Sequence, residues 1–339
     1  RLIASSPGPY MGFIGPIQTD TDPRKMDLYV TTLENMASCP WQTFLKHILR
    51  LEPSQDPLGA IPEATLLELG SLVHAVLERL VSSILGDGVG GSLELALGRI
   101  PIEIPWPEED ELRMILQREA ERLLVEQGLR LAGLSRVLCC RAMPYLMVAK
   151  EVDWAQRASP PRVLTVEVEG GLEVVDGQEK TTVRFRADRA DLTPEGLLLT
   201  DYKVGKSISE AVKEETRTRN FLEQVASGQR LQAVAYAMAA SSQVPVTGRY
   251  LFLDPDTEPQ GRIFRVQGHQ VRFKETLYEV LRALLRAWRK GVFFPRLVTP
   301  DGKKEPTRCE HCEVSTACFR GDSGIRTRLL RWAESAMDR

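Results

Sequence analysis

The stretch VRFRADRADLTPEGLLLTDYKVGK, residues 183 to 206, decides the fold that this sequence predicts. Apolar residues alternate with arginines ahead of TPEG at 193 to 196, which supplies Pro and Gly for a chain reversal. The LLLT run that follows is typical of a buried strand. We therefore predict a β-hairpin, with Asp188 on its first arm and Asp201 and Lys203 on its second.

Two acids and a lysine come together in this hairpin. Side chains two apart on a strand point to the same side, so Asp201 and Lys203 share a face and Tyr202 points to the other. Carboxylate oxygens are ligands that suit Mg2+ or Mn2+. The hairpin thus predicts a metal site beside a cation, and we expect Asp188 as ligand because Asp191 lies closer to the turn.

Length and composition favour a globular protein without a membrane segment. The chain has 339 residues, of which 43% are hydrophobic, so it can bury a substantial core in one large domain or two small ones. Its net charge of −2 gives no global signature of nucleic-acid binding, so any contact with a polyanion must be local. We find neither a leader nor an apolar run of the roughly 18 residues that span a membrane, and expect a soluble, cytoplasmic protein. Since the chain starts with Arg1 rather than Met, we also expect a piece of a longer polypeptide.

Helical and strand patterns alternate along the chain. Residues 1 to 28, rich in Pro, Gly, Ser and Thr, predict a surface linker or extended segment. The spacing of Thr31 and Glu34 predicts a capping box for the first helix, with a break at Pro40. The order of elements predicts an α/β or α+β domain over residues 29 to 339, with a sheet flanked by helices. Helices are expected at 31–51, 63–85, 108–132, 135–158, 221–241 and 271–290, and strands at 161–177, 181–201, 246–254 and 261–267.

Further polar side chains are candidates for the same site. His74 lies among leucines and valines of the 63–85 helix, and is either a core histidine or a metal ligand. Glu167 and Glu169 share one face of a strand, where most acids are simply solvated. Gln232 and Tyr236 are four apart on a helix and face one direction. They either pack on the sheet or serve the reaction, with Gln232 orienting a water or phosphate oxygen and Tyr236 lining the substrate path.

Cysteines near the end of the chain predict a second metal site. A CxxC pair with a third Cys nearby, in CEHCEVSTAC, argues for thiolate ligation rather than disulfides. A tetrahedral thiolate site needs a fourth ligand. Cys139 and Cys140 are adjacent within a predicted helix, which leaves Cys39, although a zinc site using His311 or Cys39 stays open. The expected ligands are Cys39, Cys309, Cys312 and Cys318.

Taken together, these motifs resemble the RecB-like branch of the PD-(D/E)XK nucleases. The resemblance covers roughly residues 28 to 320. Its motifs are His74 in GSLVHAVLE, Asp188 in FRADRAD, Asp201 and Lys203 in DYKVGK, and QxxxY from Gln232 to Tyr236. Cys39 in ASCPWQTFL and the terminal Cx2Cx5C are similar to the iron-sulfur staple of AddB-type subunits of bacterial helicase-nucleases.

The resemblance implies a restriction-endonuclease-like fold with a central mixed sheet, and a metal-dependent DNA nuclease. Lys203 would position or deprotonate the attacking water, or stabilise the charge on the phosphate. The implied metal is Mg2+ or Mn2+, with His74, Asp188, Asp201 and the backbone carbonyl of Tyr202 as ligands and Glu167 as a possible additional acid. The four cysteines would hold a 4Fe-4S cluster, with Zn2+ as the alternative. The expected contacts to single-stranded DNA are Arg184, Arg186, Arg189 and Lys206.

Three classes of function stay open. The first is a nuclease in DNA end processing and double-strand break repair, either within a helicase-nuclease or as a stand-alone iron-sulfur exonuclease similar to the CRISPR-adaptation nucleases. The chain has no Walker GxxxxGK[ST] motif, so a helicase would be another domain or subunit. The second is a non-catalytic DNA-binding scaffold, against which the complete set of two acids and a lysine argues. The third is a thiolate-bound redox or zinc module.

Overall fold

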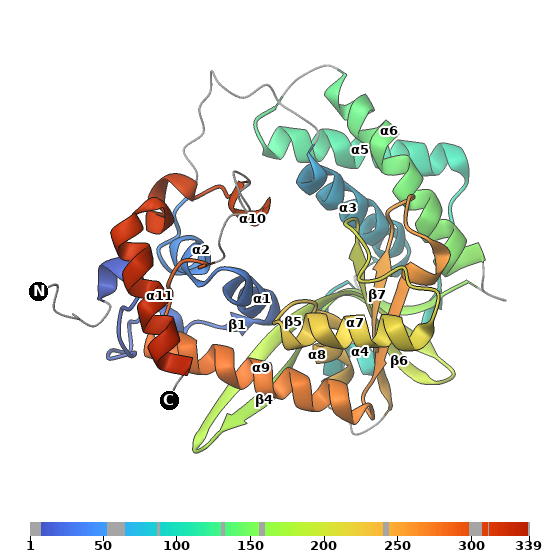
Figure 1. Cartoon of the computed structure of the whole chain (residues 1–339). Helices are drawn as coiled ribbons and strands as arrows, with labels where there is room; N and C mark the ends of the chain where they lie inside the picture. The colour runs from blue at the N-terminus through green and yellow to red at the C-terminus, as the bar shows by residue number, and fades with distance from the viewer. Residues whose placement is uncertain are drawn as a thin grey trace, which may run out of the picture.

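A computed structural model describes residues 8–52, 65–86, 89–129, 133–155, 160–239, 244–297, 307–310 and 312–337. Within these ranges, helices surround one eight-stranded sheet (Figure 1). The strands are β1 (Leu28–Tyr29), β2 (Gly91–Ser92), β3 (Ile102–Glu103), β4 (Arg162–Asp176), β5 (Glu179–Thr193), β6 (Gly196–Lys203), β7 (Val246–Phe252) and β8 (Ile263–Gln267). The helices are α1 (Val30–Ser38), α2 (Pro40–Thr43), α3 (Leu66–Leu85), α4 (Leu93–Leu97), α5 (Glu109–Glu126), α6 (Leu134–Ala149), α7 (Glu214–Ala226), α8 (Gln232–Met238), α9 (Val271–Lys290), α10 (Thr307–Glu310) and α11 (Ser323–Met337).

The sheet is mixed, with strand order β2-β4-β5-β6-β7-β8, β1 beside β5 and β3 beside β4. Strands β4, β5 and β6 form an antiparallel meander, and β7 runs parallel to β6. Both the predicted hairpin and the predicted helix-flanked mixed sheet are confirmed. The hairpin turn requires glycine at Gly196, which has φ 126° and would place a Cβ 2.3 Å from the carbonyl oxygen of Pro245.

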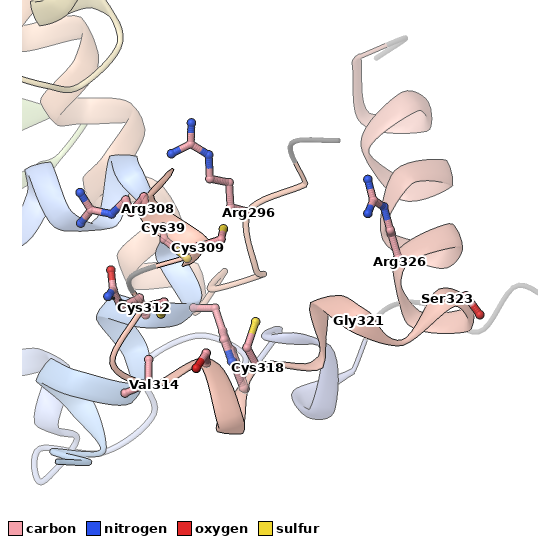
Figure 2. Close-up of a pocket in the computed structure, with 13 residues that line it drawn as sticks. Cys39, Arg296, Arg308, Cys309, Cys312, Val314, Cys318, Gly321, Ser323 and Arg326 are labelled. Atoms are coloured by element: carbon pink, nitrogen blue, oxygen red, sulfur yellow. Dashed lines mark hydrogen bonds between the residues drawn. The ribbon is translucent and has the colours of Figure 1, made fainter. Parts of the chain in front are cut away.

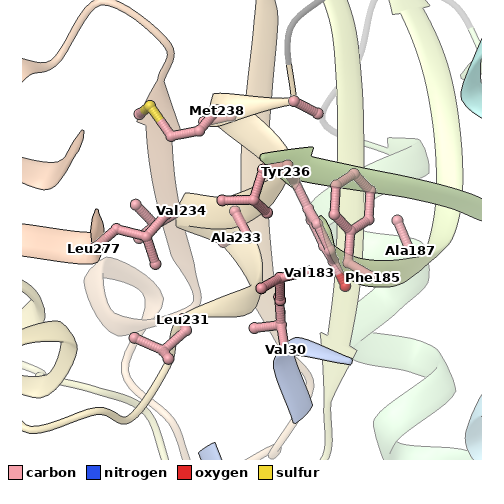
Figure 3. Close-up of a cluster of buried hydrophobic side chains, with 14 of the residues drawn as sticks. Val30, Val183, Phe185, Ala187, Leu231, Ala233, Val234, Tyr236, Met238 and Leu277 are labelled. Carbon is pink, nitrogen blue, oxygen red and sulfur yellow. The ribbon is translucent and has the colours of Figure 1, made fainter. Parts of the chain in front are cut away.

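Alternation along β6 divides its side chains between two cores. Leu197 and Leu199 join a core with residues of α8 and α9, while Tyr202 joins a core with residues of α3, α5 and α6. Figure 1 shows α3, α5 and α6 grouped on one side of the sheet. Figure 3 shows the other core, in which Val234 of α8 lies toward Leu277 of α9. Within the described ranges, no helix combines the length and apolarity needed to cross a membrane.

The helix predicted at 221–241 is in fact two helices, α7 and α8, separated by a tight bend. Gly228 has φ 78° and Arg230 has φ 54°, so two residues of the bend adopt left-handed backbone. A Cβ on Gly228 would lie 2.4 Å from the Cβ of Ala37 in α1. The bend therefore lets α1 approach closely while it redirects the chain into α8.

The predicted capping box of Thr31 and Glu34 is wrong. The residue that precedes α1 is Tyr29, and no side chain caps this helix. The Glu34 carboxylate instead accepts a hydrogen bond from the backbone N–H of Leu231, at the start of α8. The contact of Glu34 with α8 therefore replaces the local capping contact that the sequence predicts. The predicted break at Pro40 is confirmed, since α1 ends at Ser38 and α2 begins at Pro40.

The described part of the N-terminal stretch packs against the end of α9. The buried Arg24 guanidinium donates to the carbonyl oxygens of Gly15 and Trp288 and pairs with Asp22. Phe13 forms a backbone bridge with Val292. This stretch is therefore anchored to the body of the protein and is not a free linker.

Candidate active site

The candidate site forms where β5 and β6 separate. The strands are paired up to Arg189 and Thr200. Beyond that pair, the Asp188 carboxylate accepts a hydrogen bond of 2.6 Å from the backbone N–H of Tyr202. Asp188 Oδ2 also lies 3.4 Å from His74 Nδ1 on α3. The fold thus brings His74 to Asp188, while its role as a metal ligand stays a prediction.

The second arm of the hairpin brings an acid and an amine into contact. Asp201 Oδ2 lies 2.6 Å from Lys203 Nζ. Lys203 also donates a hydrogen bond of 2.8 Å to Gln232 Oε1 at the start of α8. The hydroxyl of Tyr236 lies 3.2 Å from Asp201 Oδ1 and donates to the carbonyl oxygen of Arg186 at 2.8 Å. Helix α8 therefore supports both charged groups of β6.

Tyr236 and Gln232 are buried, with exposed fractions of 0% and 8%. The expectation that Tyr236 lines an open substrate path is therefore wrong. Its ring instead lies 4.9 Å from that of Phe185, inside the core of Figure 3. Gln232 reaches the site through its contact with Lys203. From these buried positions, Gln232 contacts Lys203 and Tyr236 contacts Asp201.

The charges of the site shift the pKa of each member. Burial opposes the His74 imidazolium, but the charge and hydrogen bond of Asp188 outweigh it and raise the pKa of His74 to about 9. Burial alone would raise the pKa of Asp188, yet the His74 charge brings it below its ordinary value. Burial also works against the Lys203 ammonium, but the Asp201 carboxylate raises the pKa of Lys203. The lysine is therefore a cation in this state.

The donor atoms present suit a divalent cation. Asp201 Oδ2 is buried and faces the Lys203 ammonium at 2.6 Å. A carboxylate oxygen that faces a cation in this way also suits a divalent metal ion. Across the described ranges, no three His, Cys, Asp or Glu side chains already lie close enough to share a single ion. In this state the two acids are instead paired with His74 and Lys203.

Glu167 lies beside Asp188 at an irregular point of β4. Its neighbours Val166 and Val168 pair with Arg189 and Ala187, and Glu167 itself has φ 51°. Burial, with the Asp188 charge adding to it, raises the pKa of Glu167 to about 7. The carboxylate pairs with Arg186 at 2.6 Å. Glu167 thus stays a candidate for the additional acid.

The predicted basic residues around the hairpin divide into two groups. Arg189 is fully buried and pairs with both Asp153 and Asp191, so the expectation that it contacts DNA is wrong. A guanidinium whose charge is neutralised inside the protein does not reach a phosphate. The residues that remain on the surface are Arg184, Arg186 and Lys206.

The four cysteines named from the sequence line one pocket of about 430 Å3 (Figure 2). None of them is in a disulfide, and each is half-buried. Gln42 Nε2 lies 3.6 Å from Cys312 Sγ as a hydrogen-bond donor. Arginines contribute to the same lining, namely Arg296, Arg308 and Arg326. His311, the alternative zinc ligand, lies outside the described residues. The fold therefore brings Cys39 to the C-terminal cysteines, as the sequence predicts.

One acid near the site was assigned from the sequence to a different role. Glu34 of α1 is electrostatically coupled to Lys203 and Asp201, and burial raises the pKa of its carboxyl. In the sequence, Glu34 lies on the same predicted helix as the apolar residues Leu33 and Met36, which could have indicated a position close to the core. Both apolar residues are buried in the structure. Only the tertiary contact with Leu231 distinguishes this position from a cap.

Comparison with known proteins identifies the family. No curated protein matches the chain. A solved structure titled "Crystal structure of SSO0001" is 14% identical over 75% of this chain and 96% of that chain, with a TM-score of 0.28, a likeness too weak to argue from. The family model described as the PD-(D/E)XK nuclease superfamily matches residues 28–319, which include the whole hairpin, α3 and α8. This protein therefore belongs to the PD-(D/E)XK nuclease superfamily.

Proposed function

We propose that this protein is a metal-dependent deoxyribonuclease of the RecB-like branch that hydrolyses phosphodiester bonds, preferably in single-stranded DNA. The observation that carries the proposal is the meeting of Asp188, Asp201 and Lys203 where β5 and β6 separate, with His74 beside them. A scaffold that does not cleave DNA would have no need for a buried acid and a lysine held together beside a second acid. This argues against the alternative of a non-catalytic scaffold.

The metal ligands in this proposal are Asp188, Asp201, His74 and the backbone carbonyl of Tyr202, with Glu167 as a possible addition. A bound Mg2+ or Mn2+ supplies an activated water and a charge sink for the phosphate. Gln232 holds the Lys203 side chain in the site through a hydrogen bond of 2.8 Å. Lys203 would position or deprotonate the attacking water, or stabilise the charge on the phosphate.

The surface beside the hairpin supports binding of a nucleic-acid strand. Arg184 and Arg186 keep 45% and 61% of their side chains exposed, although each pairs with an acid. Lys206 is exposed just past the end of β6. Phosphate contacts of this kind make binding dependent on salt. The assignment to DNA end processing, double-strand break repair and a helicase partner rests on the resemblance of the motifs alone.

The four-cysteine pocket supports an iron-sulfur cluster as the second cofactor. Four soft thiolate donors around one cavity suit a cluster or zinc. We propose a 4Fe-4S cluster held by Cys39, Cys309, Cys312 and Cys318, because their pattern resembles the iron-sulfur staple of AddB-type subunits, with Zn2+ as the alternative.

The nuclease proposal is tested with a labelled single-stranded oligonucleotide and the matching duplex, with Mg2+, Mn2+ or EDTA. Asp201→Ala and Lys203→Ala are expected to lower the rate of cleavage by at least about a hundredfold, because each removes a group that acts on the reacting phosphate. Glu195→Ala is the matched control, since Glu195 is exposed in the turn at the opposite end of the same hairpin. Equal cleavage by all variants, or cleavage in EDTA, would show that the site is misassigned.

The cofactor proposal is tested by purifying the full chain without oxygen. We expect broad brown absorbance and iron, both lost in Cys39→Ser and both kept in Cys140→Ser, whose thiol is exposed elsewhere. A colourless protein that contains zinc would select the alternative metal.

A further inference from the structure

Glu34 joins α1 to the start of α8 across 197 residues of sequence. Its Oε1 accepts a hydrogen bond of 2.5 Å from the backbone N–H of Leu231, the residue immediately before α8. In a capping box, an acid within the helix satisfies this backbone group. Here the acid comes from a different helix, so the start of α8 is fixed by α1.

The next residue along α8 touches the candidate catalytic lysine. Gln232 Oε1 accepts the hydrogen bond from Lys203 Nζ at 2.8 Å. Gln232 Nε2 in turn donates to the hydroxyl of Tyr236 at 3.3 Å. Because Leu231 and Gln232 are adjacent, a displacement of the Leu231 backbone moves the amide that orients Lys203.

The backbone at this point is held against its own preference. Arg230 has φ 54°, a left-handed conformation that costs a residue other than glycine about 1 kcal/mol or more. Its guanidinium lies 5.2 Å from the ring of Phe252, so its side chain is anchored on β7. Such a conformation persists only where neighbouring contacts fix it. The bond from Leu231 to Glu34 is the contact that comes directly after it.

We infer that Glu34 is a positioning residue of the nuclease reaction, which acts through Leu231 and Gln232 to hold the Lys203 ammonium at the scissile phosphate. Glu34 does not touch the reacting atoms itself. The inference rests on the proposed function, because it requires Lys203 to act in cleavage. It adds a residue of α1 to the residues of the hairpin and of α8 that affect cleavage.

The test compares Glu34→Ala with Glu34→Gln by steady-state cleavage of a single-stranded oligonucleotide with Mg2+. Glu34→Ala is expected to lower kcat by about ten- to a hundredfold, because it releases the group that orients Lys203. KM should stay within about twofold, since no DNA contact is removed. Glu34→Gln keeps an oxygen that accepts from the Leu231 N–H, so it should restore kcat to within about threefold of the wild type. The control is Asn35→Ala, which removes the neighbouring polar side chain of α1 and should leave kcat unchanged.

Hydrogen exchange of residues 229–238 provides a readout that does not depend on activity. Exchange should be faster in Glu34→Ala and normal in Glu34→Gln and Asn35→Ala. Unchanged exchange in Glu34→Ala, an equal loss of kcat in Glu34→Gln, or a rise in KM alone would each overturn the role of Glu34. If the three variants show the expected differences in exchange but the wild-type chain never cleaves DNA, the result would count against the proposed function instead.

Discussion

At the scale of single residues, the sheet near the site contains a second set of charges with a structural role. Arg189 pairs with Asp153 and Asp191 and donates to the hydroxyl of Tyr202 at 2.6 Å. Arg249 also pairs with Asp153, at 2.7 Å. All four charged side chains are at least 99% buried. These charges balance one another on the face of the sheet opposite to α8, so they hold β5 and β6 in place without taking part in the reaction.

Removing one member of this set takes a charged partner away from buried groups. We expect Arg189→Ala to lower the free energy of unfolding by about 3–5 kcal/mol, because buried Asp191 and Asp153 both lose the guanidinium that pairs with them. Urea unfolding at neutral pH measures the difference. Arg184→Ala, on the same strand but 45% exposed, is the control and should change stability little. The reverse result, with a stable Arg189→Ala variant that binds DNA weakly, would restore Arg189 to the DNA contacts.

At the scale of elements, the position of α8 depends on its close approach to β7. A Cβ at Gly248 would lie 1.7 Å from the carbonyl oxygen of Ala233, so only glycine allows this spacing. Helix α8 carries Gln232 and Tyr236, the two side chains that contact Lys203 and Asp201. The geometry of the site therefore depends on a small residue in the neighbouring strand.

Gly248→Ala is expected to push α8 away from the sheet. We predict a loss of about 1–3 kcal/mol in stability, together with a lower kcat, because the clash is with backbone that has no side chain to rotate away. Thermal unfolding and cleavage of single-stranded DNA measure the two effects. Gly98→Ala serves as the control, because its Cβ would meet its nearest neighbour at an ordinary 3.6 Å. Wild-type stability in Gly248→Ala would mean that α8 can shift without cost.

Local sequence patterns predicted most of these helices and strands, but not the tertiary contacts between them. The hairpin, α9 and the two strands β7 and β8 follow from alternation and helical spacing that tertiary contacts do not override. The bend at Gly228 and Arg230 could not be predicted, since it depends on Ala37 and Phe252, which are distant in sequence. Burial of Arg189 was also missed, because its partner Asp153 lies on a different element. Charge alone does not tell a surface arginine from a buried one.

At the scale of the whole molecule, the C-terminal cysteine segment packs on the helices that follow β1. Trp41 Nε1 donates to the carbonyl oxygen of Ala317 at 3.2 Å, and its ring lies 4.5 Å from that of Phe319. Lys46 pairs with Glu313. Figure 1 shows α2 between α11 and α10, with α10 on the side toward α3. These contacts join the C-terminal segment to the N-terminal helices through protein groups alone.

In the N-terminal stretch, the ion pair between Asp22 and Arg24 contributes stability that depends on pH. The pKa of Asp22 is lowered from its ordinary value of 3.8, chiefly by hydrogen bonds from the Arg24 guanidinium. A carboxyl with a lowered pKa stabilises the fold fully above its unfolded value, and this contribution is lost as the pH falls through the folded value. We expect Asp22→Asn to cost about 1 kcal/mol at pH 7, and this difference to shrink below about pH 4. Urea unfolding over a pH series measures it, with Asp256→Asn, a substitution at an exposed position, as the control. A difference that does not vary with pH would contradict this account.

The contacts of the C-terminal segment have a consequence for the order in which parts of the protein fold during synthesis. Helix α1 with Glu34 and the hairpin with Asp188, Asp201 and Lys203 leave the ribosome well before residues 312–319, which pack on Trp41 of α2. Translation that stops before these residues therefore yields a fragment that contains the hairpin and Glu34 but leaves Trp41 uncovered. The C-terminal segment is thus among the last parts of the chain to fold.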